Sequence, residues 1–86
     1  MAARFELFNA IANDGSAKAR LYIREHGYLN VVRFRNVFYP EVVADLTARG
    51  GSVDRLPALW DGEKLVEGAE AIIARLQAYS DVGRGT

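Results

Sequence analysis

The stretch from residue 55 to residue 70 constrains the fold more than any other part of this chain. It predicts a strand, a two-residue turn, a second strand and the start of a helix. Asp61-Gly62 is typical of a type I′ hairpin turn, because Asp and Gly best tolerate the positive φ that both central positions require. Pro57 opens the first strand, where its missing N–H does least harm to a sheet. Gly68 then permits a sharp change of direction into the helix.

Upstream of this stretch, strands and helices are expected to alternate. A short strand over residues 4–9 is followed by turn residues and by a helix over residues 17–26, for which Asp14 or Ser16 is the expected N-cap. A β-rich segment then covers residues 29–37. Its alternating arginines indicate that one of its faces is wet.

The second half of the chain completes the pattern. Pro40 suits the first position of a short helix over residues 40–49, and the last helix is expected over residues 69–79. The resulting order is β-α-β-α-β-β-α, in which the first βαβ unit should be parallel and right-handed. This order predicts a mixed four-stranded sheet with helices on both faces. Trp60 is expected to pack on the sheet, and Phe38-Tyr39 to pack at the helix start.

Composition limits the possible functions. The 86 residues predict one domain over residues 1–80 and a flexible C-terminal tail over residues 81–86. There is no cysteine and only one histidine, so we expect neither disulfides nor a metal site. The 11 basic residues equal the 11 acidic ones, so no nucleic-acid or membrane partner is expected.

The expected compartment follows from hydropathy. Residues 1–12 contain acids and polar groups where a signal peptide would be apolar. No run approaches the ~20 apolar residues of a membrane span. A soluble, cytoplasmic protein is therefore expected.

With these elements in place, the chain resembles the thioredoxin-like fold over about residues 4–79. The resemblance is carried by Leu56-Pro57-Ala58-Leu59, by Asp61-Gly62 and by residues 65–72. It is closest to glutaredoxins and to the N-terminal domain of glutathione S-transferases. The resemblance implies a three-layer α/β/α domain with a cis Pro57.

The resemblance also implies a binding site for glutathione or for an extended peptide. Leu56 would pair with the ligand backbone through its N–H and C=O, and the start of the last helix would hold a carboxylate. The Glu70 side chain would meet the ligand amino group, and Arg55, or Lys18 and Arg20, would meet the glycine carboxylate. The implied ligand-binding residues are Asn13, Arg55, Leu56, Pro57, Gly68, Ala69 and Glu70.

The chain departs from these families where glutaredoxins carry Cys-x-x-Cys. The corresponding tetrapeptide is Asn13-Asp14-Gly15-Ser16, so thiol–disulfide exchange by this chain is excluded. We therefore expect a redox-inactive, glutaredoxin-like domain that binds glutathione or an extended peptide.

Two alternatives stay open. In the first, the domain is transferase-like, and Ser16 is the catalytic residue that stabilises the glutathione thiolate. Two features weaken this reading: Glu67-Gly68 replaces the Glu-Ser typical of transferases, and another chain would have to supply the helical domain for the electrophile. Ser16 is more simply a helix cap. In the second alternative, the domain is a protein-interaction scaffold with no small ligand.

Overall fold

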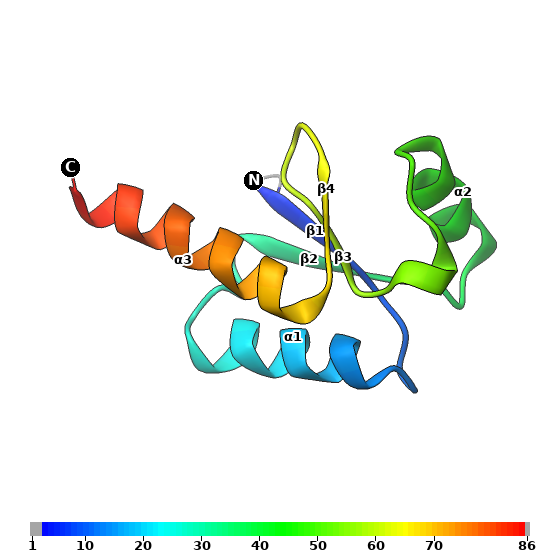
Figure 1. Cartoon of the computed structure of the whole chain (residues 1–86), viewed down its shortest axis with the longest axis horizontal. Helices are drawn as coiled ribbons and strands as arrows, with labels where there is room; N and C mark the ends of the chain where they lie inside the picture. Colours follow the sequence, from blue (N-terminus) through cyan, green and yellow to red (C-terminus); the bar gives the residue numbers. More distant parts are fainter. Residues whose placement is uncertain (1–2, 86) are drawn as a thin grey trace.

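The computed structural model describes residues 3–85, with the backbone alone for residues 81–85. Within this range, a four-stranded sheet stands at the middle of the molecule and three α-helices surround it (Figure 1). In chain order the elements are β1 (Phe5–Asn9), α1 (Asp14–Glu25), β2 (Val32–Asn36), α2 (Pro40–Ala48), the 3-10 turn η1 (Val53–Arg55), β3 (Ala58–Trp60), β4 (Leu65–Glu67) and α3 (Ala69–Gly85).

The sheet is mixed, with the strand order β2-β1-β3-β4. The central strand β1 runs parallel to β2 and antiparallel to β3, and β3 pairs with β4 in an antiparallel hairpin. Because β1 is covered on both faces, Phe5, Leu7 and Phe8 are fully buried. The predicted element order and mixed sheet are confirmed, and they are compatible with a thioredoxin-like arrangement.

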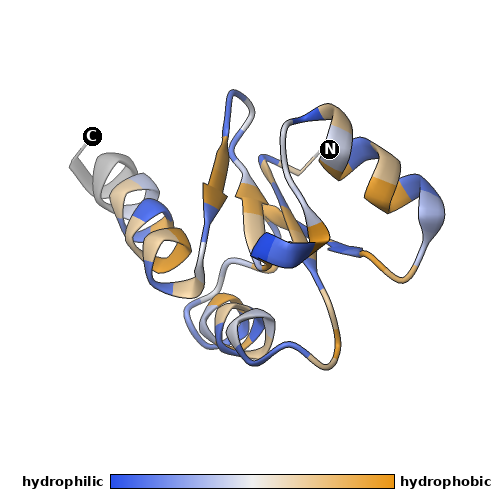
Figure 2. Ribbon diagram, turned by 45° about the vertical axis from the view of Figure 1, so that its right-hand side comes forward, coloured by the Kyte–Doolittle hydropathy of each residue, from blue (hydrophilic) through white to orange (hydrophobic). Residues whose placement is uncertain are grey.

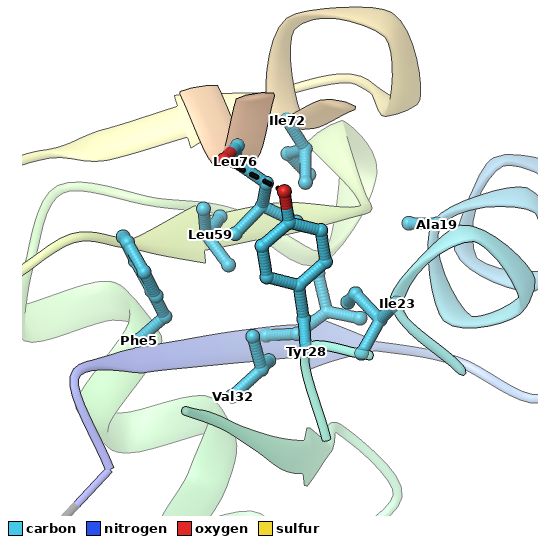
Figure 3. Packing of buried hydrophobic residues seen from close by; sticks show 9 residues of the cluster. Phe5, Ala19, Ile23, Tyr28, Val32, Leu59, Ile72 and Leu76 are labelled. Atoms are coloured by element: carbon cyan, nitrogen blue, oxygen red, sulfur yellow. Dashed lines mark hydrogen bonds between the residues drawn. The ribbon is translucent and has the colours of Figure 1, made fainter. Parts of the chain in front are cut away.

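Helices α1 and α3 cover one face of the sheet. Ile23 of α1 and Ile72 and Leu76 of α3 pack against Phe5 and Leu59 of the strands (Figure 3). Tyr28, in the loop before β2, also reaches this core, and its hydroxyl donates a hydrogen bond of 3.1 Å to the Leu76 carbonyl (Figure 3). This buried bond joins α3 to the loop that leads into β2.

Helix α2 covers the other face, and Figure 2 again shows it across the sheet from α1 and α3. Its Val42 and Leu46 pack against Phe8 and Ala58. Trp60 is partly buried beside them, which confirms the expectation that it packs on the sheet. Pro40 is the first residue of the helix, as predicted.

The prediction of a two-residue type I′ turn at Asp61-Gly62 is wrong. Among the described residues only glycines have positive φ, so Gly62 (φ 99°) does and Asp61 does not. The strands end at Trp60 and resume at Leu65. The Asp61 carboxylate accepts hydrogen bonds from the backbone N–H groups of Glu63 (3.0 Å) and Lys64 (2.9 Å), and this stabilises a longer turn.

Three further boundaries differ from expectation. The N-cap of α1 is Asn13, whose side chain accepts the Ser16 N–H at 2.6 Å, so neither Asp14 nor Ser16 caps this helix. Strand β2 is shorter than predicted because residues 28–31 form a turn, in which the Tyr28 carbonyl accepts the N–H groups of Val31 and Val32. Helix α3 continues past residue 79 to Gly85, since no proline or glycine interrupts residues 79–82.

The expected flexibility of residues 81–86 stays a prediction. Residues 81–85 have helical backbone, and residue 86 lies outside the described residues. None of the helices in the described part of the chain combines the length and apolar character needed to cross a membrane.

Candidate ligand-binding site

Three separate segments meet at Pro57. The Leu56–Pro57 peptide bond is cis, as predicted. The Pro57 carbonyl accepts the Gly68 N–H at 2.9 Å, which fixes the start of α3 beside it. On the other side, a Cβ on Gly15 would lie only 2.9 Å from Pro57 Cδ, so the first turn of α1 packs on the proline ring. The structure therefore brings residues 13–16, 55–57 and 68–70 together.

Leu56 presents an open backbone at this meeting point. Its φ and ψ of −91° and 152° are extended, and within residues 3–85 no group hydrogen bonds its N–H or C=O. Its half-buried side chain packs against the hydrophobic cluster under α2, which includes Phe8 and Leu46, so the residue is held in place. An extended backbone with a free donor and acceptor can pair with an extended ligand as strands pair in a sheet.

The start of α3 offers further donors. Gly68 (φ 94°) precedes the helix and has no side chain that could cap it. Among the described residues, no group accepts the N–H of Ala69 or Glu70. Unpaired N–H groups at a helix start, together with the helix dipole, favour an anion. The predicted carboxylate-binding position is thus chemically suitable.

Charged side chains lie around this backbone. Glu70 is 90% exposed, and its Oε2 lies 4.0 Å from Lys18 Nζ. Arg55 Nε donates to Glu67 at 2.9 Å, and its Nη2 donates to the Gly50 carbonyl at 3.2 Å. Glu70 and Lys18 are therefore free to rearrange around a ligand, whereas Arg55 would have to leave the Glu67 carboxylate.

Arg20 and Ser16 face elsewhere. The Arg20 guanidinium donates to the Asn9 side chain (2.9 Å) and to the Ala10 carbonyl (3.1 Å). Ser16 is fully buried, and its hydroxyl accepts the Ala10 N–H at 3.1 Å. Both side chains hold the loop between β1 and α1. The Ser16 hydroxyl is therefore enclosed within the protein and already bonded to this loop.

A second cluster of charges, which the sequence interpretation missed, lies between the sheet and α2. Arg35 of β2 is 11% exposed and donates to both Glu6 and Asp45, and Arg49 donates to Glu6 at 3.0 Å. The hydrogen bond from Arg35 lowers the pKa of Asp45 against a smaller opposing effect of desolvation. Arg35 also lies over the Phe8 ring, so the prediction of a wet face on β2 is wrong for this residue.

Sequence signals for these contacts were weak. Arginines at alternate strand positions did point to one shared face, but the acids that they meet come from other elements. The buried Asn9 side chain (4% exposed) accepts a hydrogen bond from Arg20 and donates one to the Leu7 carbonyl. No sequence pattern indicates this role.

In the part of the chain that the structure describes, His, Asp and Glu side chains do not gather in a group of three that could hold a metal ion. Comparison with known protein families, with curated proteins and with solved structures finds no match for this chain. Function is therefore inferred from the chain's own geometry.

Proposed function

We propose that this chain is a thioredoxin-like, redox-inactive domain that binds glutathione or a similarly short, extended peptide beside Leu56. The observation that carries the proposal is the unpaired N–H and C=O of Leu56 between the starts of α1 and α3. The expected cytoplasmic location fits such a ligand, because glutathione keeps cytosolic thiols reduced.

Each part of glutathione has a chemically suitable partner. The cysteinyl backbone would pair with Leu56, and the γ-glutamyl carboxylate would accept the N–H groups of Ala69 and Glu70. The exposed Glu70 side chain would then meet the γ-glutamyl amino group. Lys18, which is 59% exposed, supplies a cation at the rim for the second carboxylate.

Chemistry at the ligand sulfur has little support. The sequence contains no cysteine, so the chain provides no thiolate to attack a disulfide. The Ser16 hydroxyl, which would hold a glutathione thiolate in the transferase alternative, is buried and already accepts the Ala10 N–H. The arrangement thus favours binding over transfer.

Titration of the 15N-labelled chain with reduced glutathione tests the proposal. We expect amide shifts at millimolar ligand that are confined to residues 13–16, 55–58 and 68–70. S-methylglutathione should cause the same shifts with similar affinity, because this site offers the sulfur no partner. Absence of shifts at millimolar ligand would reject a glutathione site and leave the scaffold alternative.

A pair of matched variants locates the ligand. Glu70→Gln removes the charge proposed to meet the amino group, and it should weaken binding about threefold to tenfold. Glu63→Gln removes the same charge from the exposed turn after β3 and should leave the affinity unchanged. Equal effects of the two substitutions would mean that general electrostatics, and not this site, attracts the ligand.

A further inference from the structure

Within residues 3–85, strand β2 is an edge of the sheet, because β1 is its single strand partner in the order β2-β1-β3-β4. An edge strand carries a row of backbone groups that can pair with another chain. Which groups are open follows from the ladder with β1. The Phe5 N–H donates to the Val31 carbonyl, and the Val37 N–H donates to the Asn9 carbonyl.

These two bonds show which residues of β2 direct their backbone N–H and C=O groups toward β1. In a parallel ladder alternate residues face the partner, so residues 31, 33, 35 and 37 turn their backbone groups toward β1. The residues between them turn theirs outward. The Val32 N–H is bonded to the Tyr28 carbonyl, and the Asn36 carbonyl accepts the Tyr39 N–H. Within the described chain, the Val32 carbonyl, both groups of Phe34 and the Asn36 N–H have no backbone partner.

The side chains beside this edge form a surface of mixed character. Arg35 reaches Asp45 of α2, so Arg33, two residues earlier, lies on the same face of the sheet. On that face a hollow of about 330 Å³ lies between β2 and the start of α2. Its lining includes Arg33 and Tyr39, and Tyr39 is 51% exposed.

Phe38-Tyr39 was expected to pack at the start of α2, and this expectation is wrong. Phe38 is 81% exposed, and its ring stacks edge-on against Tyr39 with 5.5 Å between centroids. Phe34 is 37% exposed on the strand itself. Three aromatic rings therefore lie exposed along or next to the open edge.

The charge of the edge indicates the chemistry of a partner. Arg35 already has two carboxylate partners, whereas Arg33 is exposed and forms no ion pair with the described residues. Glu41 lines the same hollow, and Arg33 interacts with Asp45 only through the longer-range Coulomb field. A residue directly opposite Arg33 on an added strand would point to the same face. An acidic side chain at that place would form a direct ion pair with the Arg33 guanidinium.

The same geometry disfavours a second copy of this chain as the partner. Suppose that the β2 strands of two copies pair antiparallel through these open groups. The residue that lies opposite its own copy can then be Phe34, Arg33 or Arg35. These registers place Arg33 opposite Arg35, Arg33 opposite Arg33, or Arg35 opposite Arg35. Like charges directly opposite each other are destabilising, so every such register is opposed.

We propose that the β2 edge binds an extended acidic segment of another protein by strand addition. The open groups of Val32, Phe34 and Asn36 hydrogen bond the segment, and Arg33 pairs with an acidic side chain opposite it. An apolar residue next to the acid lies against Phe34. This surface is separate from the Leu56 site and does not depend on glutathione binding.

Two blocked pentapeptides, Thr-Glu-Val-Glu-Thr and Thr-Lys-Val-Lys-Thr, test the proposal by NMR titration of the full chain. The acidic peptide should shift the amides of residues 32–36 and slow hydrogen exchange at Phe34 and Asn36. Arg33→Glu should weaken its binding about threefold to tenfold, as reversal of one exposed ion pair would. The lysine peptide should bind the wild type more weakly.

Arg24→Glu is the matched control, because it reverses an exposed charge on α1 and should leave binding at the edge unchanged. The proposal is overturned if neither peptide shifts β2, if both peptides bind equally, or if the two arginine variants weaken binding alike. Concentration-dependent dimerisation that slows the same amides would overturn it in favour of a second copy.

Discussion

A Cβ atom added to Gly15 would lie 2.9 Å from Cδ of Pro57. This distance is shorter than Cβ contacts in real proteins, and the proline ring is not the mobile end of a flexible side chain. Glycine at position 15 therefore permits the close approach of α1 to the Leu56–Pro57 segment. The candidate site depends on this approach, since it joins residues that are far apart in the chain.

Gly15→Ala should consequently destabilise the protein, although alanine is the better helix former. The gain in helix propensity is at most about 1 kcal/mol, and overpacking a tight contact costs about 1–3 kcal/mol. We expect the free energy of unfolding, measured with urea, to fall by about 1–2 kcal/mol. Arg24→Ala, at an exposed position of the same helix, should change it by less than about 0.5 kcal/mol. A Gly15→Ala protein more stable than wild type would show that the ring moves aside freely.

Ser16→Ala separates a structural role of the hydroxyl from a catalytic one. Removing Oγ leaves the part-buried Ala10 N–H without its acceptor, and an unpaired donor that water does not reach costs about 1–3 kcal/mol. We expect that loss in urea unfolding, with glutathione affinity unchanged in the folded protein. The control is Ser52→Ala, which removes an exposed hydroxyl that accepts the Asp54 N–H and should cost less. A loss of glutathione affinity at unchanged stability would instead place the hydroxyl in the site.

The features that the sequence predicts well depend on local backbone chemistry. Pro57, Gly68 and the alternation of strands and helices each constrain a few neighbouring residues, so their effect is readable from a short window. Asp61-Gly62 predicts a turn at this place, and the structure has one. The Asp61 carboxylate, however, bonds two N–H groups further along the chain, and this selects a longer turn than the dipeptide suggests.

The N-cap of α1 is a local feature that the sequence does signal. Asn13 accepts the Ser16 N–H three residues further on, and Asn is among the most favoured N-cap residues, while the Ser16 hydroxyl bonds the loop before the helix. The environment of Arg35 depends instead on tertiary packing. Arg35 has the alternation of a wet strand face, yet acids from β1 and α2 meet it. Because these acids come from outside the strand, spacing within the strand carries no signal for them.

Tyr28→Phe tests the bond that joins α3 to the loop before β2. The buried hydroxyl donates to the Leu76 carbonyl at 3.1 Å, and a buried hydrogen bond of this kind contributes about 0.5–1.5 kcal/mol. We expect the free energy of unfolding to fall by that amount, and amides near Leu76 to exchange faster. Tyr39→Phe removes a hydroxyl from an exposed ring and should have no effect. Equal stability of the two variants would contradict a role for this bond.

Asp61 should make stability depend on pH in the acidic range. Burial alone would raise the pKa of Asp61. Hydrogen bonds from the Lys64 and Glu63 N–H groups and from Arg75 together lower it by more, so the pKa lies below its ordinary value. The folded protein thus takes up this proton less readily than the unfolded chain. The carboxylate therefore stabilises the fold above about pH 4, and this contribution is lost as the pH falls through the lowered pKa.

Asp61→Asn isolates this effect, because the amide oxygen still accepts the turn N–H groups but carries no charge. Urea unfolding between about pH 3 and pH 6 should show wild type more stable at the upper end, with the two proteins converging as the pH falls. Arg75→Gln removes one cause of the lowered Asp61 pKa, so the stability contributed by the Asp61 charge should begin to be lost at a higher pH. Parallel stability curves for wild type and Asp61→Asn would show that the Asp61 charge contributes nothing to the fold.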